Sequence, residues 1–334
     1  MIRLLKILAL LALVWTGYWF AAGWGLRQGL AEWFATQAAR GWQADYADIQ
    51  AGGYPLRHRH RLIAPALADP GTGTAWRAAW LELDSPAIWP GRMTLRLPDS
   101  PQRLSHLDRS ATLTAQAMEA ALDLHPGPAL ELRRMALQSG PWALAEAGAP
   151  LARADSLTLA MTQAPETPES YDLRAEATGF APGQALRRLA AHDAGLPERF
   201  QALRLDLGLR FDRPWDRRAL EERRPQPRAI ALRLAELHWG PMRFRASGTL
   251  SVDATGLPSG EVTLRAENWR DMLAIAEQSG ALPAGAADVA ADALEMMARG
   301  QGDPTRIDAT LSLRGGRIWL GLFPLAPAPR LILR

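Results

Sequence analysis

The side chains in this sequence that could hold a metal ion or move a proton begin with its six histidines. Only His58 and His60 lie close together, and on a β-strand they would share one face. A protein zinc site needs three or four ligands, and no third ligand is evident near this pair. We therefore expect no metal site, and a polar strand face is the better explanation of the two histidines.

Arginines alternate with these histidines, so Arg57, Arg59 and Arg61 would occupy the opposite face of the same strand. Guanidinium groups bind phosphate well, which makes these three residues candidates for contact with lipid headgroups. A solvated strand face is the alternative interpretation. The basic residues of the whole chain are scattered among 35 acidic ones, with a net charge of +3. A nucleic-acid site requires clustered basic residues, so we expect no nucleic-acid partner.

Motifs for catalysis are absent from the sequence. It contains no cysteine, which excludes disulfides, zinc–thiolate sites and a cysteine nucleophile. It also contains no G-x-S-x-G, H-E-x-x-H, P-loop or G-x-G-x-x-G motif. We therefore predict no catalytic residue, no cofactor and no enzyme activity. Catalytic groups can converge from distant positions, so a hydrolase of envelope polymers stays as a third hypothesis.

The amino-terminal segment has the length and composition of a membrane span. From Ile7 to Leu26 no residue is charged, and twenty helical residues cover the ~30 Å hydrocarbon core. Arg3 and Lys6 precede this segment, which predicts a cytoplasmic N-terminus. We expect a transmembrane anchor at 1–27, continued by a helical extension at 28–42. A cleaved signal peptide is the alternative, since small residues at 21–23 could form a cleavage site.

Beyond residue 43 the dominant pattern is an alternation of apolar and polar residues, which indicates strands with one buried face. It is clearest between residues 203 and 267, where it predicts a four-strand antiparallel meander. The apolar face of this meander is the candidate lining of a lipid-binding groove: Leu205, Leu207, Leu209, Phe244, Leu250, Val252 and Leu264.

The rest of the exported region, 43–334, shows a similar but weaker pattern, and it could divide into halves at 43–180 and 200–334. A Gly315-Gly316 hairpin turn is expected near the C-terminus. Asn268 is a plausible N-cap for one of the expected helices. The segment 213–228 is expected to be a loop. Further candidate strands lie at 44–51, 56–63, 75–83, 93–97, 111–124, 129–138, 155–162 and 171–178, and helices at 183–192, 269–279 and 285–299.

These patterns predict a mainly β fold with a few helices, a β-rich α+β class in which curved antiparallel sheets follow an N-terminal transmembrane helix. Strands with one apolar face must hide that face. They can do so by closing as a barrel, by stacking as a sandwich, or by curling around a ligand as an open apolar groove. The predicted helices are few, which favours the groove.

Several short motifs resemble one bacterial family. Gly53-Tyr54-Pro55-Leu56-Arg57 is similar to its G-[FY]-P-x-R signature, and further matches lie at 237–240, 248–250, 256–260, 268–270 and 313–321. On these motifs the chain is identified as a member of the domain-of-unknown-function family numbered 2125. The resemblance implies a membrane-anchored alphaproteobacterial protein and supplies no activity. A weaker architectural similarity is to AsmA-like envelope proteins, which implies an apolar β-groove linked to phospholipid movement.

The leading hypothesis is an envelope protein of the inner membrane, single-pass, with a periplasmic main domain that binds or transfers membrane lipid. The alternative is a non-catalytic scaffold for an envelope complex, with unknown protein partners.

Overall fold

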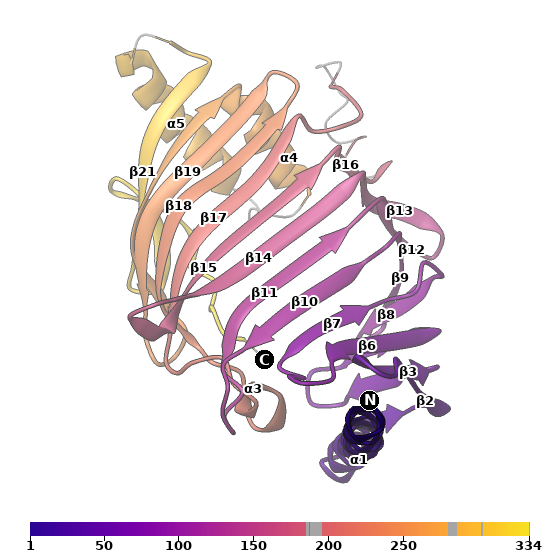
Figure 1. Ribbon diagram of the computed structural model, residues 1–334. Helices are drawn as coiled ribbons and strands as arrows, with labels where there is room; N and C mark the ends of the chain where they lie inside the picture. The colour runs from indigo at the N-terminus through magenta and orange to yellow at the C-terminus, as the bar shows by residue number, and fades with distance from the viewer. Residues whose placement is uncertain (185–186, 188–195, 280–285, 302, 334) are drawn as a thin grey trace. The chain divides into compact units, whose positions relative to one another are not determined.

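A computed structural model describes residues 1–334 except 185–186, 188–195, 280–285, 302 and 334 (Figure 1). The fold is mainly β, with an N-terminal apolar helix, and the described strands form open antiparallel sheets, as the sequence predicted. The chain divides into two compact units, Met1–Leu124 and His125–Arg334. This division falls earlier than the interval between 180 and 200 that the sequence suggested.

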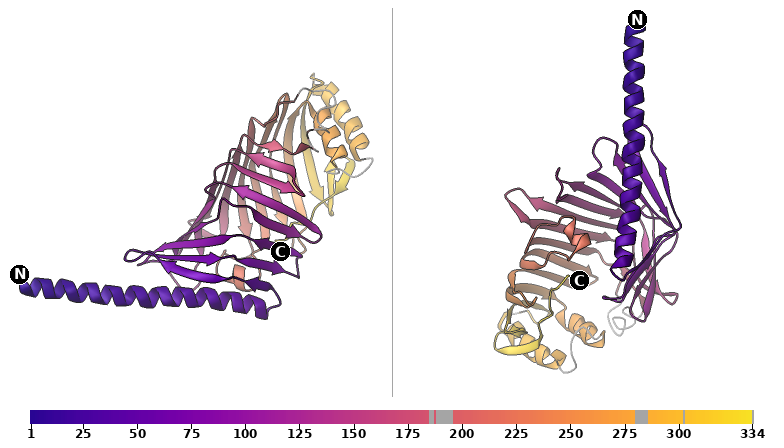
Figure 2. Two further views of the ribbon diagram at one scale, coloured as in Figure 1. Left: turned by 90° about the vertical axis from the view of Figure 1, so that its right-hand side faces the viewer. Right: turned by 90° about the horizontal axis from the view of Figure 1, so that it is seen from below.

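Unit 1 begins with helix α1 (Ile2–Ala39), which runs without interruption through the expected anchor and ends three residues before the end of the expected extension. Its side chains from Ile2 to Val14 are mostly exposed, whereas Trp19 and Phe34 are buried. Figure 2 shows that the N-terminal part of α1 projects beyond the strands of unit 1. α1 is long and apolar enough to cross a membrane.

The strands of unit 1 form two sheets, ordered β2-β3-β6-β7-β10 and β1-β4-β5-β8-β9. Consecutive strands such as β1 and β2, or β3 and β4, enter different sheets, so the chain is a meander of long strands that each bend in the middle. The ten strands are β1 (Gln43–Asp45), β2 (Asp48–Gly52), β3 (Arg57–Ile63), β4 (Ala66–Asp69), β5 (Thr74–Arg77), β6 (Trp80–Pro86), β7 (Arg92–Arg96), β8 (Gln102–His106), β9 (Arg109–Ala115) and β10 (Glu119–Leu124).

In unit 2 the strands up to β16 again divide between two sheets, whereas all strands from β17 onward belong to one sheet. Its main sheet has the order β11-β14-β15-β17-β18-β19-β20-β21-β22-β23, and β12-β13-β16 form a second, smaller sheet. The strands are β11 (Leu132–Ser139), β12 (Trp142–Glu146), β13 (Ala149–Ala154), β14 (Ser156–Ala164), β15 (Thr167–Thr178), β16 (Ala181–Pro182), β17 (Ala202–Phe211), β18 (Pro227–Trp239), β19 (Met242–Val252), β20 (Pro258–Glu267), β21 (Arg306–Arg314), β22 (Arg317–Leu320) and β23 (Phe323–Pro327).

The meander predicted over 203–267 is present as β17, β18, β19 and β20, each antiparallel to the next. The hairpin between β21 and β22 turns at Gly315 and Gly316, whose φ angles of 58° and 70° lie in the left-handed region. A two-residue hairpin turn of this geometry requires positive φ at both positions, which glycine adopts without strain.

Helices α4 (Trp269–Gln278) and α5 (Ala286–Gln301) contact β19, β21 and β23 of the main sheet (Figure 1). Asn268 occupies the N-cap position of α4, as expected, but its side chain makes no capping hydrogen bond; the side-chain amide donates to the Pro241 carbonyl at 2.7 Å instead. The expected loop 213–228 contains one short helix, α3 (Arg218–Glu221). Most of the helix expected at 183–192 lies outside the described residues.

Candidate functional site

The main sheet of unit 2 has one continuous apolar face. Its strand registers align residues into rows that cross the sheet, because cross-strand partners point to the same side. One such row runs Leu137, Leu159, Ala175, Leu205, Ala235, Ala246, Leu264 and Ala309, from β11 to β21. The next row includes Leu203, Leu237 and Phe244, which are partners on β17, β18 and β19.

The opposite face of the same strands carries paired charges. The Arg204 guanidinium on β17 donates to Glu176 on β15 at 3.0 Å and lies 3.5 Å from Glu236 on β18. Glu236 in turn accepts from Arg245 on β19 at 2.6 Å. Charged side chains therefore satisfy one another on this face and are absent from the apolar rows. The two faces are as different chemically as the alternation of the sequence predicted.

The described residues cover only parts of the apolar face. Under α4 and α5, Phe244 and Leu264 pack with Trp269 and Ile307, the latter only 2% exposed. At the other end of β17, Leu209 packs into a cluster that includes Trp215. Between these covered regions lie half-buried leucines that belong to none of the packed hydrophobic clusters among the described residues: Leu157, Leu203 and Leu205.

A groove of about 400 Å³ occupies this uncovered stretch, and we call it the apolar groove. The volume falls within the range of roughly 300–1,000 Å³ that small-molecule sites occupy. It extends from β14 to β19, four strand spacings of about 4.8 Å or ~19 Å. Three charged residues that lie between apolar lining residues in the sequence, Glu176, Arg204 and Glu236, also border the groove. Its apolar lining residues are Leu157, Ala175, Ala177, Leu203, Leu205, Ala235, Leu237 and Phe244.

The structure places the seven lining residues proposed from sequence in different surroundings. Leu205 and Phe244 line the apolar groove, and Leu207 lies half-buried beside it with Leu173 and Leu232 as strand partners. The other four lie elsewhere on the same face: Leu209 beside Trp215, Leu264 under α5, Leu250 half-buried against Ile230, and Val252 buried at the end of β19.

Sequence reasoning did not select the lining residues on β14 and β15, among them Leu157 and Ala177. The signal was available, because both strands alternate in the same way as β17, and β15 pairs in register with both β14 and β17. Both strands were expected from this alternation, with Leu157 and Ala177 on their apolar faces, but only residues of the meander over 203–267 were selected as the groove lining.

In unit 1, one face of β3 carries Arg57, Arg59 and Arg61. On the same side of the sheet, the neighbouring strand β6 carries two buried carboxylates, Glu82 and Asp84, which form ion pairs with these arginines. Burial alone would raise the pKa of the Asp84 carboxyl. Hydrogen bonds from Arg57 at 2.7 Å and Arg96 at 3.1 Å outweigh that effect, so this pKa lies below its ordinary value. The arginine side chains remain more than a third exposed, and each keeps N–H donors at the surface.

His58 and His60 do not form the polar strand face that the sequence indicated. They are 2% and 3% exposed because α1 covers them. The His58 ring stacks on Trp19 at 5.2 Å between centroids, and His60 Nε2 lies 3.1 Å from the Gly23 carbonyl oxygen. Burial lowers the pKa of both imidazoles. Their role is to pack the helix against β3, and no cluster of three metal-binding side chains occurs in the described ranges.

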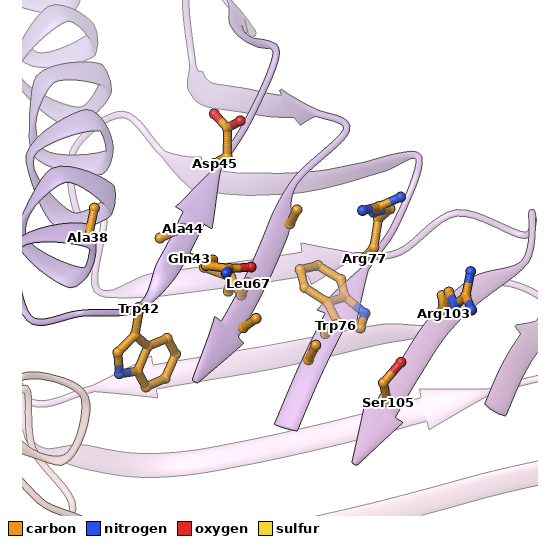
Figure 3. A pocket seen from close by; sticks show the side chains of 13 residues that line it. Ala38, Trp42, Gln43, Ala44, Asp45, Leu67, Trp76, Arg77, Arg103 and Ser105 are labelled. Carbon is orange, nitrogen blue, oxygen red and sulfur yellow. The ribbon is translucent and has the colours of Figure 1, made fainter. Parts of the chain in front are cut away.

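A second hollow, of about 650 Å³, lies in unit 1 between the end of α1 and the sheet that contains β4 and β5 (Figure 3). Trp42 flanks it, and Arg77 and Arg103 line it as direct partners on β5 and β8. Two like charges directly opposite each other are unfavourable on a sheet. The lining of this hollow is mainly polar, unlike that of the apolar groove, and its arginines are exposed.

These features define a class of protein: an open antiparallel β-meander with an apolar sheet face, preceded by a helix that is able to cross a membrane. Comparison with protein families agrees with the motifs found in the sequence. Residues 19–329 match the family described as uncharacterized proteins conserved in bacteria, DUF2125. The chain belongs to this family. No curated protein matches it.

Proposed function

We propose that the protein is a non-catalytic lipid-binding protein of the bacterial envelope, anchored in the inner membrane by α1 with its β-units in the periplasm. The observation that carries the proposal is the apolar groove. Half-buried leucines line it, and no packed hydrophobic cluster of the described residues includes its centre at Leu205.

The dimensions of the groove suit an acyl chain. Half of a ~30 Å hydrocarbon core, the depth of one leaflet, is about 15 Å, and the groove crosses about 19 Å of sheet. Each buried methylene contributes up to about 0.8 kcal/mol. A long acyl chain could therefore bind without specific headgroup contacts, and the absence of charged side chains from the apolar rows is consistent with such a ligand.

The orientation rests on charge. Arg3 and Lys6 precede the apolar part of α1, and positive flanks remain on the cytoplasmic side. The β-units follow on the other side of the membrane. This topology would keep a lipid-binding groove in the envelope.

Photocrosslinking in cells tests the proposal. Probes at Leu205 and Phe244 should yield lipid adducts, while probes at Arg243 and Arg245, which flank Phe244 on the charged face and do not line the groove, should not. Adducts confined to the first pair would support lipid binding. Protein adducts at Leu205, with lipid adducts at no position, would replace the proposal with the scaffold hypothesis.

A further inference from the structure

The contacts between α1 and the strands of unit 1 fix how far these strands can lie from the membrane. Three side chains of α1 donate hydrogen bonds to carbonyl groups at the ends of strands. Trp15 Nε1 donates to Pro55 at 3.0 Å, Tyr18 Oη to Ala87 at 2.8 Å, and Trp19 Nε1 to Arg57 at 2.8 Å. The two loops that precede β3 and follow β6 are therefore held against the helix at the level of residues 15–19.

These two loops expose large apolar side chains. Leu56 is 72% exposed and Ile88 is 78% exposed. Tyr54 is 53% exposed, and its hydroxyl lies 2.8 Å from Thr16 Oγ1 of the helix. Three apolar residues at adjacent loop tips, beside an apolar helix, form a patch that water does not favour. We call Tyr54, Leu56 and Ile88 the apolar tip.

We propose that the apolar tip inserts into the outer boundary of the bilayer that α1 crosses. This inference rests on the membrane anchoring proposed above. The sequence alone placed the span at Ile7–Leu26. With that placement, the loop at Trp15 would lie eleven helical residues or ~16 Å below the boundary, near the bilayer centre. Irregular backbone exposed to lipid does not occur at that depth.

If the membrane-spanning segment of α1 lies nearer the N-terminus, the loop no longer falls at the bilayer centre. Interfacial apolar groups insert about 5–10 Å below the boundary, which is three to seven helical residues. If the loop contacted by Trp15 lies at that depth, the boundary falls near residues 18–22. From Met1 to that level is ~26–32 Å of helix, which matches the ~30 Å core. Arg3 and Lys6 then lie about 2–8 Å and 6–12 Å inside the inner boundary, and their long basic side chains extend from there to the headgroups.

The charges of β3 fit the same placement. Successive contacts follow α1 and β3 in the same direction, since Trp19 meets Arg57 and Gly23 meets His60. Arg57 is therefore the arginine of this strand nearest the apolar tip, and Arg59 lies about 7 Å further from it. The headgroup layer is ~5–7 Å deep, so these two side chains, 43% and 48% exposed, would reach phosphates. Arg61 lies beyond that layer.

Site-specific fluorescence tests the insertion in the full chain, reconstituted in vesicles of phosphatidylglycerol and phosphatidylcholine. Because the protein has no cysteine, Leu56→Cys and Ile88→Cys each carry one label. The matched control is Leu107→Cys, also a turn leucine of unit 1, 73% exposed. Ser105, two residues before it, lines the same hollow as Ala38, about 28 Å along α1 from Trp19.

A polarity-sensitive label at Leu56 or Ile88 should show a blue-shifted emission and strong quenching by lipids that carry a nitroxide near the headgroup. The label at Leu107 should show neither. Adding Ile88→Asp should reduce quenching of the label at Leu56 several-fold, whereas adding Leu107→Asp should not. Emission at 56 and 88 equal to that at 107 would overturn the insertion.

This experiment and the crosslinking test fail independently. Quenching at the apolar tip without lipid adducts at Leu205 would refute lipid binding in the apolar groove and support the insertion of the tip. Lipid adducts at Leu205, together with labels at the tip whose emission is that of a label in water, would support lipid binding and refute the insertion.

Discussion

A matched pair of truncations separates an open apolar groove from a packed core. Ile307→Ala and Leu205→Ala each remove three carbons from the same face of the main sheet. Ile307 is 2% exposed and packs with Trp269 and Ala298 under the helices. Its truncation loses ~2.4 kcal/mol of transfer free energy and leaves a cavity, so the total loss should lie within about 2–5 kcal/mol.

Leu205 borders the apolar groove and is only half-buried. Without lipid, its truncation should lower the free energy of unfolding by about 1 kcal/mol, half of the transfer term, because no closed cavity forms. A bound lipid stabilises the folded state, and Leu205→Ala should weaken that effect while Ile307→Ala leaves it intact. Urea unfolding of the detergent-solubilised chain, followed by tryptophan fluorescence with and without added lipid, measures both values. Equal losses for the two variants in lipid-free protein would show that protein fills the groove.

Three further predictions concern buried polar groups, each measured by the free energy of unfolding. The buried His58 has a lowered pKa, so only the unfolded chain gains its proton as the pH falls below about 6.5. Stability should therefore fall below that pH, and His58→Phe should flatten the decline; an unchanged pH profile would contradict this. Burial raises the pKa of Tyr171 to about 12, and its hydroxyl accepts from the Trp215 backbone N–H at 3.0 Å. Tyr171→Phe should cost about 1–3 kcal/mol by leaving that N–H unpaired, and a neutral result would refute the bond. Asp84→Asn should cost about 1.5–3 kcal/mol, less than a fully buried ion pair because its arginine partners are partly exposed, and a stabilised variant would refute this pairing.

The sequence predicted best where each strand lies in one sheet. From β17 to β20 the boundaries and most of the apolar face agree with the structure; the exception is a bulge in β18 between Leu232 and Ala235, which places Leu234 opposite Asp206 on the charged face. In unit 1 the expected strands 44–51, 75–83 and 111–124 each correspond to two strands that enter different sheets. Only two or three residues separate the two strands of each pair, so the alternation in the sequence gives little indication that the chain bends there.

At two such bends the chain needs a left-handed residue, and alanine supplies it. Ala64, between β3 and β4, has φ 49°, and Ala117, between β9 and β10, has φ 48°. Positive φ is uncommon for alanine, so no glycine or asparagine marks these corners in the sequence. The surroundings of His58 were equally hidden, because they depend on α1 lying along β3, a contact between distant segments that alternation cannot indicate.

The order of the strands has a consequence for how the protein is made. In both units nearly every strand pairs with strands close to it in sequence, so each hairpin can join the growing sheet soon after it has been synthesised. Domains that fold during synthesis do so from the N-terminus. Unit 1 is complete at Leu124, and α1 is the first element to emerge. The sheets of each unit can therefore form in the order of synthesis, without waiting for the C-terminus.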